Sequence, residues 1–586
     1  MKAIRRRPDR AYLDNWLWVP KQHMNVEGTK SALSFAFTDS YSESRIRYLY
    51  LWREAPRHLL VPRSFWKPEE LPYPIVDCRP RQLKSVKFTS HIKLDHLPDE
   101  HGVLQPTGLD TQQKALDAML RAPGGILQLA CGKGKTVVFL ELVAQMGVPA
   151  LVIVPDTHLM EQWERQANAL LDIPGGIGYI QAERYDWNKS LVLATYHSIA
   201  SKAEQLRAEG AQSYFGVIGW DEGHHVSAPT FAPGAELFFG RRYALTATPI
   251  REDGTHIVYE YHIGPVLFKD LSATIKPRVV FKWTGLEIDE TQPDAKVRDK
   301  NGELHISKIT SYYGKWKTRL GMILNDVNEA IKAGRQRILV LSYSIGEVAN
   351  LCAMMTYGAG APLYTDLPVP VPTDVGETLN PAELSKMDLK KLPRMLKSVE
   401  SQLASRSLNP TKEANLKAKV VEIKQRLKQH EVFVKIEREM AKRQRDYIKA
   451  LRKDIGNAGL MIHEVPAKMR ASYVKKCQVV FAIMKYGKEG LDAPDLDAVI
   501  VCEPFSQRNG LQQVMGRTVR ERPGKMRPVI LFYEDKVGPI LGMCKKLKAH
   551  LSGWAHEEGG PFDYEVFGAM NTRQSWNSTS QQIFGP

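Results

Sequence analysis

A glycine- and lysine-rich turn at residues 131–136 constrains this chain more than any other stretch of its sequence. It follows a short apolar run at 126–130 and leads into a helix-like pattern at 136–146, so we predict a strand, a phosphate-binding loop and a helix. The two glycines of the turn can direct backbone N–H groups at phosphate oxygens, because neither has a Cβ atom. The second lysine could reach the β- and γ-phosphates, and the threonine could hold Mg²⁺ through its hydroxyl. The residues expected to bind a nucleoside triphosphate here are Cys131, Gly132, Lys133, Gly134, Lys135 and Thr136.

The turn departs from the strict Walker pattern at one position. That pattern has a glycine five residues before Gly134, and this chain has Leu129 there. A turn that only joins a strand to a helix would also fit these residues. Motifs elsewhere in the chain are therefore needed to distinguish a nucleotide-binding loop from a turn that only joins a strand to a helix.

The length and charge of the chain limit the number of domains and the kind of partner that can be expected. With 586 residues the chain is too long for one core and should form roughly three or four domains. Lys and Arg outnumber Asp and Glu by 81 to 65, and the net charge of +16 favours a polyanionic partner, although a basic surface kept for solubility is an alternative. The six cysteines include no Cys-x-x-Cys pair, so we expect neither a zinc site nor a disulfide framework. No apolar run is long enough to span a membrane, and no leader-like segment follows the basic N-terminus, so we expect a soluble, cytoplasmic protein.

The first hundred residues look like a separate, smaller module. They are rich in aromatic residues and arginines, and residues 45–53 alternate well enough for a strand. Interleaved basic and aromatic side chains suit a surface that follows a phosphate backbone and stacks on bases. A small sheet with core aromatics and solvated arginines explains the pattern equally well.

Apolar strand-like runs then alternate with helical patterns, which predicts a parallel sheet covered by helices. In such sheets the chemistry collects at the carboxyl ends of the strands. A polar cluster follows each run here. The predicted strands are 126–130, 150–154, 191–195, 215–220 and 243–246.

Two adjacent carboxylates follow the predicted strand at 215–220. Asp221 would hold Mg²⁺, usually through water, and Glu222 would act as the general base that polarises an attacking water. The next polar residues, His224 and His225, could instead be metal ligands, but adjacent side chains point different ways in regular structure. The carboxylate pair therefore favours triphosphate hydrolysis.

The motifs Gly-x-Gly-Lys-Thr, Asp-Glu-x-His and Thr-Ala-Thr, in this order and spacing, resemble those of superfamily 2 helicases and translocases. The resemblance implies two RecA-like domains, ATP and Mg²⁺ as cofactors, and a nucleic-acid track. Gln112 stands where the family contacts adenine, but Leu109 or Asp110 replaces the arginine usually found ahead of it. The resemblance assigns nucleic-acid contacts to Pro155, Gln162, Trp163, Thr195, Tyr196 and His197, and coupling roles to His224, Thr246, Ala247, Thr248 and Arg251.

A second α/β pattern begins after a linker near 271–285, with an amphipathic helix expected at 319–333 and buried strands at 337–344, 478–482 and 498–502. Its Gln-x-x-Gly-Arg-x-x-Arg run matches the family's last motif, although an isolated Arg-x-x-Arg is usually a solvated helix face. The two guanidiniums lie on one helix face and would stabilise charge on the transferred phosphoryl group when the domains close. The residues that the resemblance assigns in this domain are Ser344, Gly490, Asp492, Gln513, Arg517 and Arg520.

Residues 366–467 are extra chain that the family core does not need. Apolar residues recur with helical spacing at 392–403 and at 416–434, so we predict a helical hairpin packed along an apolar seam. Residues 411–453 contain 14 Lys and Arg against 6 Asp and Glu. Such an arm could grip or split a duplex, but a solvated hairpin or an arm that docks a protein partner also fits. The Gly-, Ser-, Asn- and Gln-rich tail is expected to be partly flexible.

These features together predict an α/β protein with two tandem RecA-like parallel-sheet domains, a small N-terminal α+β domain and a helical-hairpin insertion in the second RecA-like domain. Within the superfamily the chain looks most like XPB-type DNA translocases and the branch-migrating helicases of tailed phages. The expected activity is ATP-dependent movement on single-stranded, forked or branched DNA, with unwinding or branch migration in repair, recombination or replication, in a prokaryotic or phage-infected cytoplasm. An RNA helicase, or a non-unwinding translocase subunit of a larger defence or repair complex, remains an alternative. The expected domains are 1–105, 106–275, 276–365 with 468–555, the insertion 366–467 and the tail 556–586.

Overall fold

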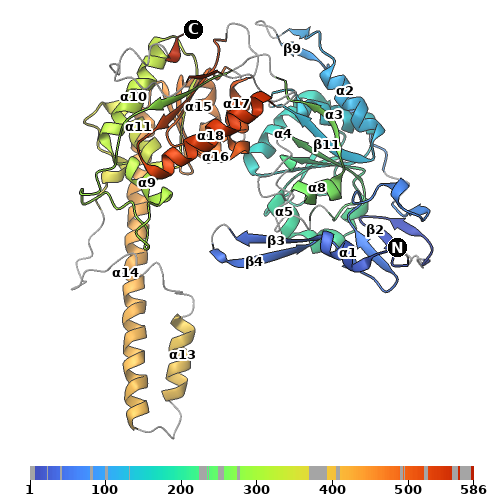
Figure 1. Ribbon diagram of the computed structural model, residues 1–586, viewed down its shortest axis with the longest axis horizontal. Helices are drawn as coiled ribbons and strands as arrows, with labels where there is room; N and C mark the ends of the chain where they lie inside the picture. The colour runs from blue at the N-terminus through green and yellow to red at the C-terminus, as the bar shows by residue number, and fades with distance from the viewer. Residues whose placement is uncertain are drawn as a thin grey trace. The chain divides into compact units, whose positions relative to one another are not determined.

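The computed structural model contains an N-terminal module, two α/β domains and a helical arm (Figure 1). None of the helices among its described residues is long and apolar enough to cross a membrane. The structure describes residues 7–22, 24–39, 42–79, 84–98, 103–130, 132–223, 234, 236–247, 256–272, 277–368, 392–403, 410–488, 493, 495–519, 525–556, 565–567 and 583–585.

The first α/β domain is built on a seven-stranded sheet in which every neighbouring pair of strands is parallel. The five predicted strands of this domain are all present, with ends that differ from the prediction by at most two residues. From one edge to the other the strands are β14 (Ile177–Ile180), β15 (Leu191–Thr195), β12 (Ala150–Val154), β16 (Val217–Asp221), β17 (Arg241–Thr246), β11 (Gly124–Leu129) and β18 (Val266–Asp270).

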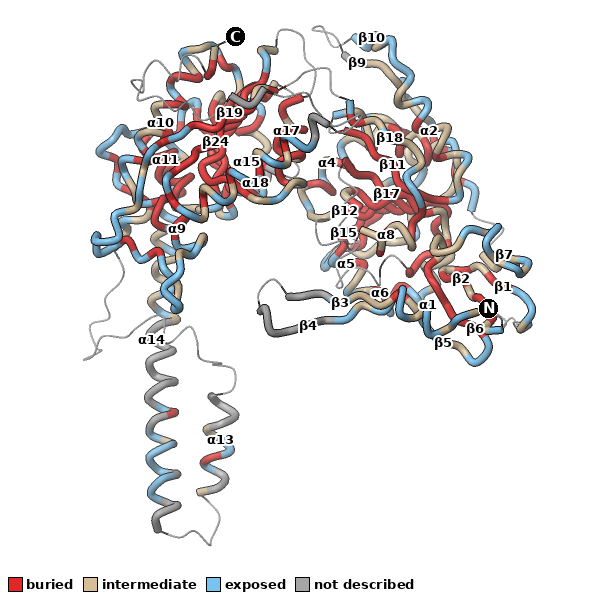
Figure 2. The backbone as a smooth tube through the Cα atoms, in the orientation of Figure 1, coloured by how far each residue is buried: buried red, intermediate tan, exposed pale blue. Residues whose placement is uncertain are grey.

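Both faces of this sheet are buried, as Figure 2 shows by the red strands. In β12, Val152 and Val154 face one core while Leu151 and Ile153 face the other, because side chains alternate along a strand. Helices therefore cover the sheet on both sides. The first core contains residues of α2 (Thr111–Arg121), α3 (Lys135–Met146) and α4 (Thr157–Leu170), and the second contains residues of α5 (Tyr196–Ser201), α6 (Ala203–Ala208) and α8 (His256–Ile263).

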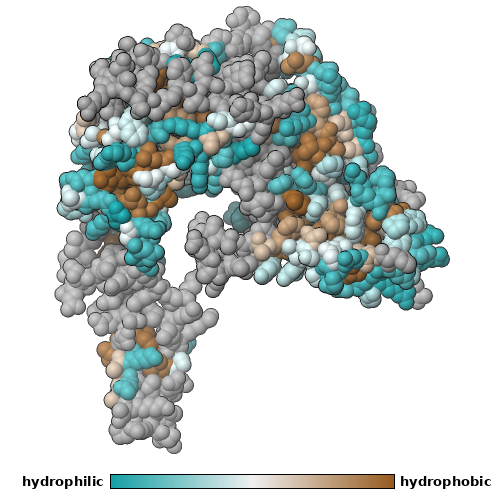
Figure 3. All heavy atoms as spheres, in the orientation of Figure 1, coloured by the Kyte–Doolittle hydropathy of each residue, from teal (hydrophilic) through white to brown (hydrophobic). Residues whose placement is uncertain are grey.

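The N-terminal module has a five-stranded sheet and a separate two-stranded ribbon. Its core includes Leu17, Leu59 and Val61, together with Val258 from the first α/β domain. Hydrophilic side chains cover most of the outer edge of the module in the view of Figure 3. Its elements are β1 (Ala11–Leu13), β2 (Leu17–Pro20), α1 (Val26–Ala32), β3 (Ser34–Asp39), β4 (Ser42–Tyr50), β5 (Arg53–Glu54), β6 (His58–Val61) and β7 (Ile75–Asp77).

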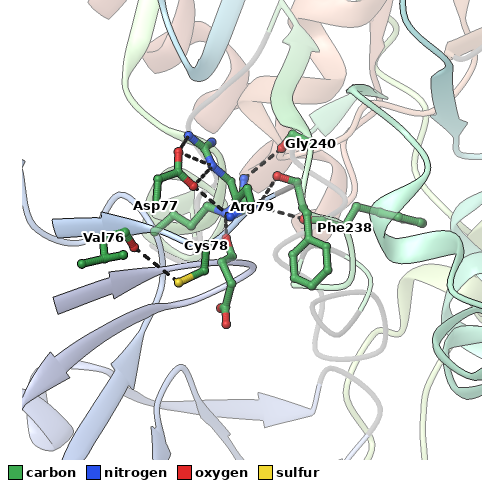
Figure 4. A network of polar contacts seen from close by, with 9 residues as sticks. Val76, Asp77, Cys78, Arg79, Phe238 and Gly240 are labelled. Atoms are coloured by element: carbon green, nitrogen blue, oxygen red, sulfur yellow. Dashed lines mark hydrogen bonds and ion pairs between the residues drawn. The ribbon is translucent and has the colours of Figure 1, made fainter. Parts of the chain in front are cut away.

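Arg63 ties the module to the first α/β domain. Its guanidinium donates hydrogen bonds of 3.0, 2.6 and 2.9 Å to the carbonyl oxygens of Phe238, Phe239 and Gly240. In Figure 4, dashed lines mark the bonds that end at the carbonyl oxygens of Phe238 and Gly240. The module and the domain are thus joined by polar contacts as well as by a shared core.

Residues 84–98 pack with the first α/β domain rather than with the N-terminal module. Val86 and Phe88 lie in the core beside α3. The short strand β8 (Thr89–Ser90) pairs with β13 (Leu171–Asp172). The packing of this domain therefore starts ahead of the boundary expected at residue 105.

The second α/β domain also has a seven-stranded sheet, in the order β21-β22-β20-β23-β24-β19-β25. The predicted strands and the predicted helix are present, which confirms the tandem parallel-sheet architecture. The strands are β21 (Ala458–Met461), β22 (Val479–Ile483), β20 (Ile338–Ser342), β23 (Ala498–Val501), β24 (Val529–Glu534), β19 (Arg278–Trp283) and β25 (Glu565–Phe567), and the helices include α10 (Lys317–Lys332), α11 (Ile345–Tyr357), α15 (Ala467–Lys476), α17 (Arg508–Thr518) and α18 (Gly538–His556).

The predicted helical hairpin is present as α13 (Leu392–Leu403) and α14 (Pro410–Asp454), which lie side by side (Figure 1). Val399 and Ile423 are buried in the seam between them. Helix α14 covers the whole of the basic segment 411–453 that was expected to form the arm. In the tail, β25 joins the second sheet and Phe584 is fully buried, and most of residues 557–586 lie outside the described residues, so the expected partial flexibility stays a prediction.

Candidate nucleotide site

The phosphate loop has the backbone that its glycines predict. Gly132 and Gly134 have φ angles of 87° and 80°, in the left-handed region that favours glycine, and α3 begins directly after them. A Cβ atom on Gly134 would lie 2.4 Å from Nε2 of Gln112. The loop therefore leaves no room for a side chain at the point where helical N–H groups begin.

Gln112 is held against this loop from both ends of its amide. Its Oε1 accepts from the backbone N–H of Asp95 (2.7 Å), and its Nε2 donates to the carbonyl oxygen of Lys133 (3.3 Å). The Asp95 carboxylate in turn accepts from the N–H groups of Gln112 (2.9 Å) and Gln113 (3.0 Å). Asp95 is not predictable from the sequence, because no local motif connects it with a glutamine so far along the chain.

Lys133 does not point into the loop. Its ammonium lies 2.6 Å from the Asp270 carboxylate and 2.6 Å from the Ser272 hydroxyl. Burial alone would raise the pKa of Asp270, but the hydrogen bonds from Lys133 and Ser272 hold it below its ordinary value. The Lys133 side chain is therefore engaged outside the loop, and phosphate binding by this residue stays a prediction.

Lys135 lies at the start of α3 and folds back over the loop. Its Nζ donates to the carbonyl oxygen of Leu129 over 3.1 Å. Leu129 thus contributes its backbone carbonyl to this contact, while its side chain lies in the core of the domain. Thr136 is half-buried in the first turn of the same helix.

Asp221 is the last residue of β16 and is buried. Its Oδ2 accepts from the indole Nε1 of Trp163 (2.8 Å), and its Oδ1 accepts from the backbone N–H of Glu222 (3.1 Å). Burial raises the pKa of the Asp221 carboxyl, against the hydrogen bond from Trp163 and the positive charge of Lys135. The phosphate-loop lysine and this carboxylate therefore lie close enough to interact, although they are far apart in sequence.

Glu222 has a φ angle of 48°, which is uncommon for a residue with a side chain. Asp95, at 55°, is the other residue of this kind among those the structure describes. Such strained conformations concentrate at functional sites, where the surroundings hold them in place. Here the hydroxyl of Tyr196 donates to the carbonyl oxygen of Asp221 over 3.1 Å and helps to fix this turn.

Two predicted nucleic-acid contacts need correction. Trp163 is 1% exposed and Tyr196 is 3% exposed, and both side chains bond to the Asp221 region instead. Each residue follows a strand in a motif that the family uses for strand contact, but its ring turns into the core because that is where the apolar surface is buried. These two buried side chains therefore contact Asp221.

The other predicted contacts of the first domain have different surroundings. Thr195 is buried and caps α5 by accepting from the N–H of Ser198 (3.2 Å). His197 is exposed, and Pro155 and Gln162 are half-buried. These last three remain candidates for contact with a strand.

Two of the predicted coupling residues, Thr246 and Ala247, lie at the end of β17, which runs between the loop strand β11 and the carboxylate strand β16. Thr246 and Ala247 are both buried. The carbonyl oxygen of Ala247 accepts a long bond of 3.5 Å from Nε2 of Gln128, just before the phosphate loop. This position is consistent with the predicted coupling role.

The second domain contributes Gln513 and Arg517, which are half-buried and one turn apart on α17. Ser344 caps α11 and accepts from the N–H of Glu347 over 3.2 Å. Seven predicted site residues lie outside the described residues: Cys131, His224, Thr248, Arg251, Gly490, Asp492 and Arg520.

The side chains present fit a magnesium–nucleotide complex. A threonine hydroxyl and a carboxylate, Thr136 and Asp221, are the oxygen ligands that Mg²⁺ prefers, and such sites keep several waters. Within the described part of the chain, no group of three or more His, Cys, Asp or Glu side chains is placed to hold a metal.

Comparison with known proteins agrees with these features. The family described as the type III restriction enzyme res subunit matches residues 106–251. The DNA 3'-5' translocase XPB2 of Sulfurisphaera tokodaii is 34% identical over 176 residues, which are 30% of this chain and 38% of that protein. The DNA 3'-5' helicase XPB of Mycobacterium tuberculosis is 34% identical over 172 residues, which are 28% of this chain and 31% of that protein.

A phage protein is also similar. The probable helicase D10 of Escherichia phage T5 is 27% identical over 150 residues, which are 25% of this chain and 32% of that protein. The chain thus aligns with less than two fifths of the length of each of these three relatives. By its motifs and these similarities, the first α/β domain is similar to XPB-type helicases and translocases of superfamily 2.

Proposed function

We propose that this protein is an ATP-dependent DNA helicase or translocase that couples ATP hydrolysis to movement on DNA, with duplex unwinding or branch migration as the outcome. The observation that carries the proposal is that the phosphate loop after β11 and Asp221 at the end of β16 lie at the carboxyl edge of one parallel sheet, on strands that both pair with β17. This is the edge where parallel α/β sheets bind their ligands.

Each side chain has a defined task in this mechanism. Bound ATP supplies the phosphoryl group, and Mg²⁺ would offset the charge of its oxygens. The loop N–H groups and Lys135 would hold the phosphates, Thr136 and Asp221 would hold the metal, and Glu222 would accept the proton of the attacking water. From the second domain, Arg517 and Arg520 with Gln513 would stabilise charge in the transition state.

DNA is the proposed track because the XPB relatives carry DNA in their names and because the net charge of +16 suits a polyanion. Pro155, Gln162 and His197 on the first domain, with Ser344 on the second, would contact one strand. The basic arm α13–α14 would contact duplex DNA or a protein partner.

ATP turnover in the presence of different nucleic acids tests the proposal. We expect strong stimulation by single-stranded, forked or four-way DNA, weak stimulation by RNA, and a loss of about 10²–10⁴-fold in turnover for Glu222→Gln with ATP binding retained. Stimulation mainly by RNA would assign the protein to RNA, and turnover that ignores every nucleic acid would refute a motor function.

A further inference from the structure

The two-stranded ribbon β3–β4 projects from the N-terminal module (Figure 1) and has two different faces. Phe35 and Leu49 are cross-strand partners, and both pack against the core of the module. On the opposite face, Ala36, Tyr48 and Tyr50 are exposed. The ribbon is therefore anchored by one face and presents aromatic rings on the other.

The exposed rings form an ordered row. Tyr48 is 60% exposed and Tyr50 is 56% exposed, and their rings are nearly parallel, with centroids 6.2 Å apart and planes 10° apart. The row continues to Trp52, whose ring lies edge-on to Tyr50 at 5.8 Å and carries the Lys30 ammonium at 5.0 Å. The Trp52 indole is fixed by a 3.0 Å hydrogen bond to the Ser34 hydroxyl.

Ribbon stability alone does not explain these tyrosines. Aromatic residues stabilise a two-stranded ribbon chiefly through large cross-strand partners. Here the partner of Tyr48 is Ala36 and the partner of Tyr50 is Ser34. The small partners leave the ring faces open to solvent, at the cost of exposing apolar surface.

We propose that Tyr48 and Tyr50 form a stacking platform for the unpaired bases of single-stranded DNA. The inference rests on the proposed function and assigns the N-terminal module its share of the track. Aromatic faces accept any base, because every base has a π-face. The charge is complementary, since residues 1–79 contain 14 Lys and Arg against 9 Asp and Glu.

Equilibrium binding of a fluorescein-labelled single strand, measured by anisotropy without ATP, tests the platform. We expect Tyr48→Leu with Tyr50→Leu to weaken binding about tenfold or more, the usual loss for a base–aromatic stack. The double Phe variant keeps the rings and should bind as the wild type does. Tyr357→Leu, at a tyrosine that is 44% exposed on α11, is the matched control and should also bind normally.

The outcomes separate this inference from the proposed function. Wild-type affinity in the double Leu variant, equal losses for duplex and single strand, or stronger binding of RNA than of DNA would overturn the platform even if DNA stimulates ATP turnover. Turnover that DNA does not stimulate would refute the motor, whatever the platform binds. Thermal unfolding checks the fold, and Tyr48→Thr, a β-branched residue at an exposed strand position, repeats the test if the double variant fails to fold.

Discussion

The hydrogen bond from Trp163 to Asp221 leads to a quantitative prediction. The indole N–H donates to Oδ2 over 2.8 Å, and the ring is 1% exposed, so water cannot take its place. A buried hydrogen bond to a charged acceptor contributes about 1.5–3 kcal/mol. Trp163→Phe keeps an aromatic ring in the core and removes only the donor and part of the volume.

Without this donor, the Asp221 carboxylate loses a partner that fixes its orientation. Removing such a supporting partner typically costs about 10–100-fold in metal affinity or activity. We therefore expect the Mg²⁺ concentration for half-maximal ATP turnover to rise by that factor in Trp163→Phe. The assay measures DNA-stimulated hydrolysis against free Mg²⁺, with ATP and DNA saturating.

Trp220→Phe is the matched control. Trp220 precedes Asp221 in the same strand and is equally buried, but it lies in the core on the other face of the sheet. Both variants should lose some thermal stability, and only Trp163→Phe should change the Mg²⁺ dependence. If the two variants share one Mg²⁺ dependence, the hydrogen bond does not position the carboxylate and the reasoning is wrong.

Three further perturbations test other parts of the first domain. Gly134→Ala puts a Cβ atom 2.4 Å from Gln112 at a φ of 80°, so we expect ATP affinity to fall at least tenfold in a nucleotide-binding titration, and unchanged affinity would contradict the loop geometry. Arg63→Met removes the donor to the carbonyl oxygens of Phe239 and Gly240, so denaturant unfolding should show a loss of about 2–4 kcal/mol, and an unchanged midpoint would mean that the contact contributes nothing. Burial and nearby arginines lower the pKa of His262 to about 3 in the folded protein, below its ordinary value near 6.5. The contribution of neutral His262 to folding stability is therefore complete above pH 6.5 and is lost as the pH falls toward 3, by up to about 1.4 kcal/mol per pH unit. His262→Phe should flatten the pH dependence of the melting temperature between these values, and an unaltered slope would exclude His262 as the cause.

Much of the fold could be predicted from the sequence, because both parallel sheets are buried on two faces and their strands are continuous apolar runs. The phosphate loop was predictable for a similar reason, since Gly132 and Gly134 stand where only glycine takes the required backbone angles easily. The hairpin seam could be predicted from helical spacing. The last turns of α14 also carry apolar residues at helical spacing, and Ile448 and Leu451 are buried there.

The contacts that surround Asp221 and the phosphate loop could not be predicted from the sequence. A motif shows that Trp163 and Tyr196 follow strands, but the direction of each ring depends on which face of the sheet offers buried volume. Asp95 and Asp270 reach the loop from distant segments, and local patterns do not encode such pairings. The strained φ of Glu222 leaves no trace in residue type, because most strained positions of this kind are glycines.

Arg63 fixes the N-terminal module to the first α/β domain. Because its guanidinium ties the module to three carbonyl oxygens of the first α/β domain, the two should travel as one piece. The distance from the tyrosine row to the phosphate loop would then stay constant through a cycle of hydrolysis. A DNA strand held on that row would therefore move by the same distance as the first α/β domain in each cycle of hydrolysis.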